Sequence, residues 1–505
     1  MKKKVFVLAI CFFASVPNLG AALHQYQIEV EPNLSSIRVE ACFDGKVPNY
    51  LSVDNSLGNE DLISLPDSKQ GDIEIQGRFW KTGNLPENAC LNYQVSIERH
   101  HTKQSKRKNY TSKVKSRNKL IAYIEQNTWL WLPESLNEQD DIEINILLPK
   151  GMAVSTPWQP IPSEANRFRL GHYPQEWGYT FILGDFSQRD LKISDGHHLS
   201  ITSLKDLAGR EQIDNWLIDI ARGVERYLGD YPVKQTQVIV IAKKKKKQGP
   251  VPWGDFSRGN GFGIRFVVVP SYDIKEFYAD WTATHEFSHQ LLPKLVYDDI
   301  WLSEGLASYL QYVLMAQSGV LTQEQAWMRI FKGLKRGEAG TKKFKNEPLN
   351  MTSGNRKRGG RSGRTMRIYW SGALYFLKAD LALREQSKGR VGLNDILLKL
   401  NRCCITGSKI WTGKELAAKL DSLSGSKLFN PRLSDPKLSD SKLSDSIASD
   451  SKIFSGLYSE FSNGFDFPEY LDSLEKLGVI FSDEKRSSLE IKQHSIATEI
   501  MRKNR

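Results

Sequence analysis

The chain has 505 residues, which is enough for roughly two to four domains. Hydrophobic residues make up 40% of the sequence and charged residues 25%, as is ordinary for a globular protein. The formal net charge is +12. The basic residues are not interleaved with aromatic side chains, and no recognised nucleic-acid module is present, so we expect no nucleic-acid partner. Beyond the first 22 residues no segment approaches transmembrane length, so we expect no transmembrane anchor.

Residues 1–22 have the pattern of a signal peptide. Three lysines follow Met1, an apolar run extends from Val5 to Ala14, and Gly20 and Ala22 fit the small-residue positions of a cleavage site. The apolar run is too short to serve as a stable membrane anchor. We therefore expect an exported protein, located in the bacterial periplasm or secreted.

Residues 23–185 are dominated by a period of two. Tyr26, Ile28 and Val30 alternate with polar residues, and a similar alternation recurs over residues 142–148. Proline, glycine and asparagine separate such runs, which is typical of strands joined by turns. This pattern predicts a β-rich N-terminal domain that resembles a β-sandwich.

Four cysteines follow the predicted leader, in an oxidising compartment. Cys42 closes one alternating stretch and Cys90 opens another, and both fall outside the apolar phase of their strands. They could therefore face each other outside the core, and we expect a Cys42–Cys90 disulfide. Cys403 and Cys404 are adjacent, where a bridge would be strained, and the sequence leaves their state open.

Residues 186–387 mix helical and strand patterns and are expected to form a second domain. Apolar residues recur at helical spacing over residues 213–227, and short apolar runs at 238–242 and 266–269 predict strands. The whole chain is therefore expected to be an α+β multidomain protein.

Three helices of this second domain hold the residues of greatest interest. Asp273, with Glu276 three residues later, is expected to cap the helix that contains two histidines, and Pro293 to end it. Glu304 begins the next helix or lies early in it, and Tyr369 opens a further apolar helix.

Residues 388–505 are expected to form a helical C-terminal region. It is interrupted at residues 431–452 by low-complexity sequence that contains a five-residue repeat with one leucine per unit. Such a repeat cannot bury much surface, and the units are far too short for a solenoid. We expect a flexible surface insertion.

A candidate metal site stands out in the second domain. His285, Glu286 and His289 form the pattern His-Glu-x-x-His, and fourteen residues separate His289 from Glu304. On a helix, positions i and i+4 share one face, so both imidazoles can reach one ion. Three protein ligands with a fourth position open are typical of catalytic zinc. Ser308, one turn after Glu304, is a candidate to support a histidine. The alternative is a surface helix with two incidental histidines, but the apolar residues around the motif indicate a packed helix.

These motifs resemble those of the gluzincin clan of metallopeptidases. The pattern His-Glu-x-x-His followed by Ser-Glu-Gly-Leu-Ala-Ser-Tyr at residues 303–309 is most similar to the glycyl aminopeptidase family, and more distantly to the aminopeptidase N family. A Tyr-x-x-Gly-Ala pattern at residues 369–373 adds to the similarity. The resemblance covers most of the chain after the leader. It implies a β-rich front domain, a thermolysin-like catalytic domain and a helical C-terminal region.

The resemblance also implies residue roles. His285, His289 and Glu304 would bind one Zn²⁺ per chain, and Glu286 would act as general base on a metal-activated water. Tyr369 would stabilise the oxyanion with its hydroxyl. The alternative for Tyr369 is a core tyrosine on an apolar helix.

The chain departs from the family pattern in two places. The spacing between His289 and Glu304 is shorter than is usual for aminopeptidase N relatives. Aminopeptidases of the clan also carry a glutamate for the substrate amine on an edge strand before the zinc helix. The corresponding stretch here is expected at about residues 259–265, which contain no carboxylate. Their glycines still suit close approach of a peptide, so Asn260 and Gly261 are expected to bind substrate.

Two basic stretches, at residues 243–247 and 356–364, are either solvated loops or a rim of the cleft. As a rim they would attract acidic substrates or, weakly, an anionic envelope surface. The sequence leaves open the oligomeric state, and also whether cleavage is internal or terminal. It predicts an exported zinc peptidase. The alternative is a catalytically silent zinc-fold protein that binds peptides or acts as a scaffold in the cell envelope.

Overall fold

The computed structural model describes most of the chain. The described residues are 21–53, 61–68, 70–97, 111–116, 119–125, 128–137, 139–170, 180–204, 207, 209–244, 249–258, 260–355, 363–407, 409–425, 452–483 and 485–502. Most of the predicted signal peptide, of the repeat insertion and of the two basic stretches lies outside these residues.

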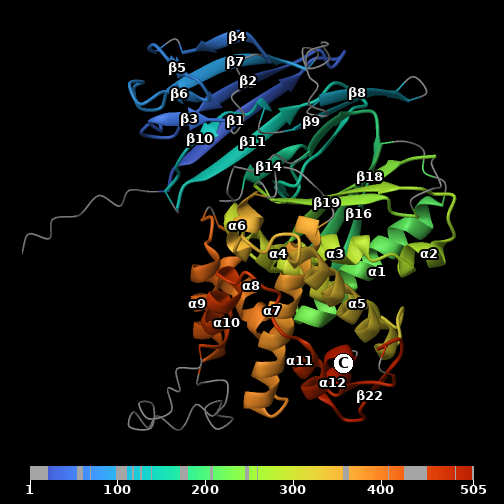
Figure 1. Ribbon diagram of the computed structural model, residues 1–505. Coiled ribbons are helices and arrows are strands. Elements are labelled where there is room, and N and C mark those ends of the chain that lie inside the picture. The colour runs from blue at the N-terminus through green and yellow to red at the C-terminus, as the bar shows by residue number, and fades with distance from the viewer. Residues whose placement is uncertain are drawn as a thin grey trace, which may run out of the picture.

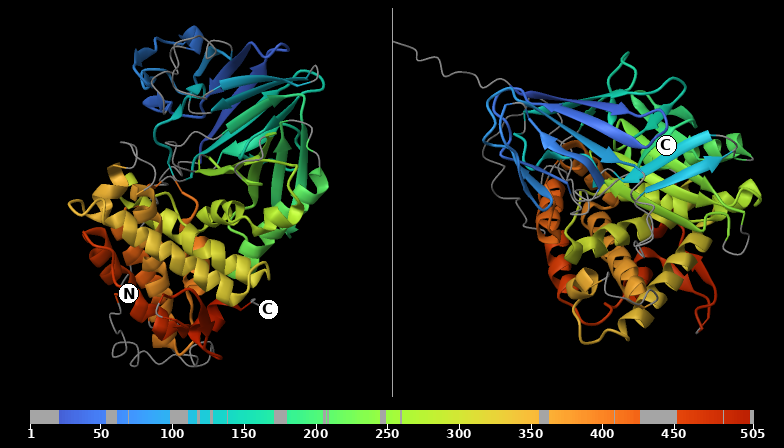
Figure 2. Two further views of the ribbon diagram at one scale, coloured as in Figure 1. Left: turned by 45° about the vertical axis from the view of Figure 1, so that its right-hand side comes forward. Right: turned by 90° about the horizontal axis from the view of Figure 1, so that it is seen from above.

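The predicted α+β multidomain architecture is confirmed (Figure 1). The N-terminal strands, coloured blue to cyan, lie at one end of the molecule, and the C-terminal helices, coloured orange to red, lie at the other. The strands of a five-stranded sheet, coloured green, lie between these two parts, as the left view of Figure 2 also shows.

Three sheets enclose the N-terminal core. On β1 the side chains of Tyr26, Ile28 and Val30 are buried while the intervening ones are exposed, which explains the period of two in the sequence. The indole rings of Trp80 and Trp131 stack at 4.2 Å within this core. The seven-stranded sheet has the order β13 (Gln159–Pro160), β14 (Arg167–Leu170), β11 (Asp141–Leu147), β1 (Leu23–Val30), β2 (Ser36–Cys42), β7 (Cys90–Ser96), β4 (Leu62–Asp67). The two four-stranded sheets have the orders β10 (Leu132–Pro133), β3 (Tyr50–Ser52), β6 (Phe79–Lys81), β5 (Glu74–Gln76), and β12 (Ala153–Ser155), β15 (Thr180–Gly184), β9 (Lys119–Glu125), β8 (Thr111–Ser116).

The predicted disulfide between Cys42 and Cys90 is confirmed. Antiparallel pairing of β2 with β7 places the two residues directly opposite each other, and their sulfur atoms are bonded. Cys403 and Cys404, whose state the sequence left open, are also joined by a disulfide. They lie at the end of helix α8 (Leu393–Cys404).

The five-stranded sheet supports the candidate site. Its order is β16 (Ser187–Ser194), β17 (His197–Ser203), β18 (Gln235–Ala242), β20 (Phe262–Val268), β19 (Trp253–Arg258). Strands β17, β18 and β20 are parallel, whereas β16 and β19 run antiparallel to their neighbours. Strand β19 is therefore an edge strand, and no strand of the described part of the chain pairs with its other side. The predicted strands at 238–242 and 266–269 correspond to β18 and β20.

Helices pack against the sheet and against one another below it. The helix predicted over residues 213–227 is α1, which ends at Gly229 in the left-handed conformation with φ 88°. Within the described part of the chain, no helix combines the length and apolar character needed to cross a membrane. The remaining elements are α2 (Ile274–Ala279), α3 (Thr282–Ser288), α4 (Ile300–Gln317), α5 (Gln323–Thr341), α6 (Leu349–Gly354), α7 (Gly363–Ser387), α9 (Gly413–Ser424), α10 (Ile453–Ser462), α11 (Leu471–Leu477), α12 (Ile496–Met501), the 3₁₀ helices η4 (His289–Leu291) and η5 (Tyr297–Asp299), and a hairpin of β21 (Val479–Phe481) with β22 (Leu489–Ile491); α1 spans Arg210–Leu228.

Candidate metal centre

The helix that carries the first histidine is shorter than the sequence suggested. Asp273 and Glu276 do form a capping box, but on the separate short helix α2, which ends at Asp280. Helix α3 begins only after Trp281, whose side chain makes no capping hydrogen bond. The single long helix predicted from Asp273 was therefore wrong. The second histidine, His289, opens the 3₁₀ turn η4 that continues α3.

His285, His289 and Glu304 come together as predicted. One oxygen of Glu304, near the start of α4, lies 3.4 Å from Nε2 of His285 and 3.7 Å from Nε2 of His289. Among the described residues these three form a group able to hold a metal ion, with all ligand atoms within 4.8 Å of one another. Tetrahedral zinc with bonds of about 2.0–2.1 Å places its ligand atoms roughly 3.3 Å apart. The donor set therefore fits zinc in both chemistry and spacing.

The far nitrogen of each imidazole is held by a side chain of α4. Nδ1 of His285 lies 2.9 Å from Oε1 of Gln311, and Nδ1 of His289 lies 3.0 Å from Oγ of Ser303. These bonds orient the rings so that both Nε2 atoms face Glu304. Ser308, the support suggested by the sequence, takes no part in these two hydrogen bonds. Gln311 lies seven residues, or two helical turns, after Glu304, and this spacing in the sequence could have indicated that both side chains lie on the same face of α4.

The surroundings of His285 favour positive charge. Burial alone lowers the pKa of its imidazole, but the hydrogen bond to Glu304 and the charges of Glu286 and Glu304 raise it more, so the pKa lies above its ordinary value. The carboxylates that raise this pKa would also attract a divalent cation.

The two proposed catalytic side chains flank the metal ligands. Glu286 is buried, lies on α3 between the two histidines in sequence, and faces a cleft. The phenol ring of Tyr369 stacks on the imidazole of His285, with ring centres 5.5 Å apart and an angle of 17° between the planes. Tyr369 also lines the cleft, which favours its predicted role over that of a core tyrosine.

Two glycines allow α4 and α7 to cross closely behind the site. A Cβ added to Gly372 would lie 2.7 Å from Cα of Gly305, and one added to Gly305 would lie 2.8 Å from the backbone nitrogen of Ala373. Gly305 directly follows Glu304, and Gly372 lies one turn after Tyr369. The crossing therefore sets the distance between a metal ligand and a proposed catalytic hydroxyl.

The cleft beside the metal ligands has a volume of about 800 Å³. It is bounded by the edge strand β19 on one side and by α3 on the other. Gly254 allows the strand to lie close to the metal helix, because a Cβ there would be 2.8 Å from Cγ of Glu286. Two exposed indoles line the opening, with 43% of Trp253 and 39% of Trp281 accessible to solvent.

The edge strand was assigned wrongly from the sequence. Residues 260–265 belong to the hairpin turn and to β20, which lies inside the sheet, and β19 is the edge. Asn260 and Gly261 line a different hollow of about 490 Å³, shared with residues such as Asn401. They are not among the residues that line the cleft at the metal ligands. The strand that does line it contains a carboxylate, Asp255.

A β-rich N-terminal part, an edge-strand sheet over the His-Glu-x-x-His motif and a helical C-terminal region together make a gluzincin aminopeptidase-like fold. The chain is similar to an aminopeptidase N family protein from Idiomarina loihiensis, with a TM-score of 0.60 and 14% identity, over 92% of this chain and 80% of that one. A looser likeness, with a TM-score of 0.48 and 12% identity, relates it to a variant of an M1 zinc metallopeptidase from Deinococcus radiodurans bound to a Tyr-Ser-Ala substrate, over 81% of this chain and 92% of that one. No protein-family model matches the chain, and no curated protein does.

Proposed function

We propose that this chain is a zinc-dependent peptidase that binds one zinc ion. The observation that carries the proposal is the convergence of His285, His289 and Glu304 within 4.8 Å, beside Glu286, in a cleft bounded by a free strand edge. An ion held there would supply Lewis-acid chemistry, polarising a carbonyl and making water acidic.

Side chains of the protein would supply proton transfer, stabilisation of the oxyanion and orientation of the imidazole rings. The carboxylate of Glu286 would accept a proton from the attacking water and pass it to the leaving amine. The hydroxyl of Tyr369 would donate a hydrogen bond to the substrate oxygen as negative charge develops on it. Ser303 and Gln311 hold the imidazole rings in place through both steps.

The cleft suits an extended peptide. The free side of β19 offers backbone donors and acceptors that can pair with a peptide strand, and a volume of about 800 Å³ accommodates several residues. Asp255 is the carboxylate of this strand, but Arg265 holds it with a hydrogen bond of 2.7 Å. We therefore expect cleavage that does not depend on a free substrate amine, and a matched pair of free and acetylated peptides would measure this.

We also propose export. The disulfide between Cys42 and Cys90 supports it, because such bonds persist in oxidising compartments. Mass spectrometry of the protein recovered from the producing cells would give the mature N-terminus. An intact Met1 on periplasmic or secreted protein, or a wholly cytoplasmic location, would contradict the proposal.

The decisive test of peptidase activity is Glu286→Gln. This variant keeps all three metal ligands, so we expect it to bind zinc while hydrolysis falls by about 10²–10⁴-fold or more. The matched control is Glu211→Gln, which changes an acidic residue in the first turn of α1 and should leave activity unchanged. Cleavage by Glu286→Gln at the parental rate would contradict the assignment. Peptide binding without cleavage by the parent protein would favour the silent scaffold instead.

A further inference from the structure

The cleft has a defined direction because β19 and α3 run side by side. Gly254 lies against Glu286, and two residues further on the ring of Phe256 stacks on the imidazole of His289, 5.9 Å away at an angle of 16°. Two residues further again, Nη2 of Arg258 donates hydrogen bonds to the carbonyl oxygens of His289 and Leu292. Arg258 therefore lies at the end of the cleft beyond His289.

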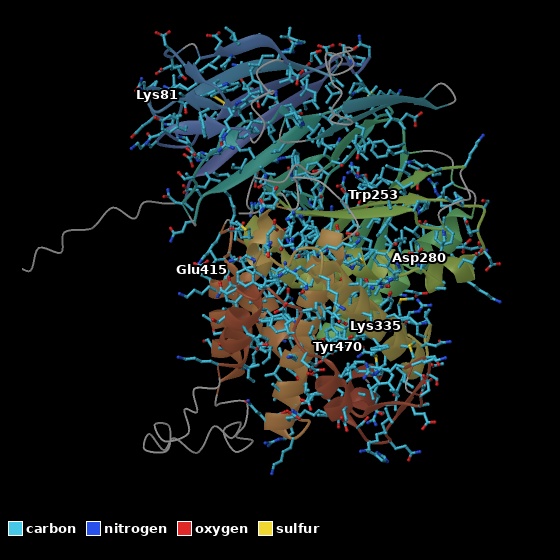
Figure 3. The ribbon with its side chains drawn as sticks, in the orientation of Figure 1. Lys81, Trp253, Asp280, Lys335, Glu415 and Tyr470 are labelled. Atoms are coloured by element: carbon cyan, nitrogen blue, oxygen red, sulfur yellow. A yellow bond between two sulfur atoms is a disulfide. The ribbon has the colours of Figure 1, made fainter. Side chains whose placement is uncertain are left out.

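The opposite end of the cleft carries the opposite charge. Asp280 precedes α3 and lines the cleft at its other end. Figure 3 labels Trp253 on the strand β19 and Asp280 below it, on the same side of the molecule. The seven residues of α3 span roughly 10 Å between the two ends. A bound peptide therefore lies in a cleft with an acidic end and a basic end.

The guanidinium of Arg258 is held rigidly and retains unused hydrogen-bonding capacity. It lies over the ring of Phe256, 4.6 Å from its centre, and near Phe262 at 5.9 Å. Nη2 donates to two carbonyls, whereas Nη1 donates no hydrogen bond among the described residues; Nε also has no partner there, but it is fully buried. As a guanidinium, the Arg258 side chain carries a positive charge at neutral pH.

A purely structural role for Arg258 explains only part of this arrangement. An arginine that caps the carbonyls at the end of a metal-binding helix would stabilise that helix end. That role uses Nη2 alone. Nη1 still has N–H groups that can donate to an oxygen of a ligand in the cleft.

A second cation lines the same part of the cleft. Lys294 lies two residues after Leu292, whose carbonyl Arg258 holds, and its side chain is 4% exposed. Arginine forms paired hydrogen bonds with carboxylates, and a neighbouring lysine adds charge.

We propose that Arg258, with Lys294 beside it, forms a subsite that binds a carboxylate of the substrate peptide at the His289 end of the cleft. The carboxylate belongs either to an aspartate or glutamate side chain or to the C terminus of a short peptide. This proposal rests on the proposed peptidase function, and it names the substrate class as acidic peptides.

The test measures a ratio that does not depend on overall activity. Peptides that differ only by Asp or Asn, or by Glu or Gln, at each position in turn are made with free and with amidated C termini. We expect the zinc-loaded full chain to prefer the acidic member of one pair, or the free C terminus, by about tenfold in kcat/KM. A preference tied to sequence position identifies a side chain, and one lost on amidation identifies the terminus.

Variants then assign the preference to its residue. Arg258→Gln should bring the ratio close to one, whereas Arg258→Lys, which keeps the charge, should retain part of it. Lys294→Gln should lower the ratio by a smaller factor. The matched control is Arg222→Gln, because Arg222 also bonds backbone carbonyls, those of Lys192 and Ile193, but does not line the cleft.

The outcomes separate this proposal from the proposed function. If the parent cleaves peptides with no preference for carboxylates, or if Arg258→Gln keeps the preference, the subsite is refuted and the peptidase stands. If the parent cleaves nothing, the same peptides are tested for binding to it by fluorescence polarisation. Tighter binding of acidic peptides that disappears in Arg258→Gln supports the subsite alone, and equal binding of both members refutes it. If Arg258→Gln does not fold, Lys294→Gln and Arg258→Lys decide, and an unchanged ratio in both refutes the proposal.

Discussion

The crossing of α4 and α7 predicts a large effect from a single methyl group. In Gly372→Ala the added Cβ would lie 2.7 Å from Cα of Gly305 and closer still to the carbonyl oxygen of Trp301. Ordinary contact begins at 3.4 Å, so relieving the Gly305 contact alone requires the helices to separate by about 0.7 Å, and relieving the nearer contact with Trp301 requires more. Both neighbours are backbone atoms, which cannot rotate away as a side chain would.

The separation of the two helices would displace Glu304 at the candidate metal centre. Glu304 directly precedes Gly305, and its oxygen lies 3.4 Å from Nε2 of His285. We expect Gly372→Ala to lower the free energy of unfolding by about 1–3 kcal/mol, as overpacked cores do. We also expect weaker zinc binding, because a misplaced ligand cannot complete the coordination shell, and a loss of activity of up to about 10²-fold.

The measurements are urea unfolding followed by circular dichroism and zinc affinity by competition with a chromophoric chelator. The matched control is Gly456→Ala on α10, where an added Cβ meets nothing within 4 Å. That change should be neutral or slightly stabilising, because alanine favours helix more than glycine does. Unchanged stability together with unchanged zinc affinity in Gly372→Ala would refute the reasoning.

Three further predictions concern the metal centre and the N-terminal domain. Ser303→Ala and Gln311→Ala should each weaken zinc binding by about 10–100-fold, because each removes the hydrogen bond that orients an imidazole. Chelator competition measures the zinc affinity, and a smaller loss would contradict the prediction. Zinc binding near pH 7 should release protons and should weaken as the pH falls through the pKa of His285, because that pKa lies above its ordinary value in the metal-free protein. Calorimetry in buffers of different ionisation enthalpy measures the proton release, and its absence would contradict the prediction. Replacing Cys42 and Cys90 together by serine removes a cross-link across 48 residues and should cost up to about 4 kcal/mol of stability, and an unchanged unfolding midpoint would contradict this.

The metal ligands could be identified from the sequence because their geometry is local. His285 and His289 share a helix face through spacing alone, and a short connection leaves Glu304 little freedom to lie elsewhere. The Cys42–Cys90 pairing was also accessible, because two cysteines out of phase with their strands point away from the same core. In both cases a periodicity of the chain fixes where the side chain points.

Which residues line the cleft depended on the pairing of strands that are far apart in the sequence. The order of strands in the five-stranded sheet decides that β19, and not the glycine-rich residues after it, is the edge beside the metal. That order moved the expected substrate contacts from Asn260 and Gly261 to β19, and it brought Arg258 to the carbonyl of His289. By itself, then, the sequence determined the candidate metal site, because the spacing along a helix is intrinsic to the chain. Only the tertiary structure decided what surrounds that chemistry, because no local pattern records which strands pair or which helices cross.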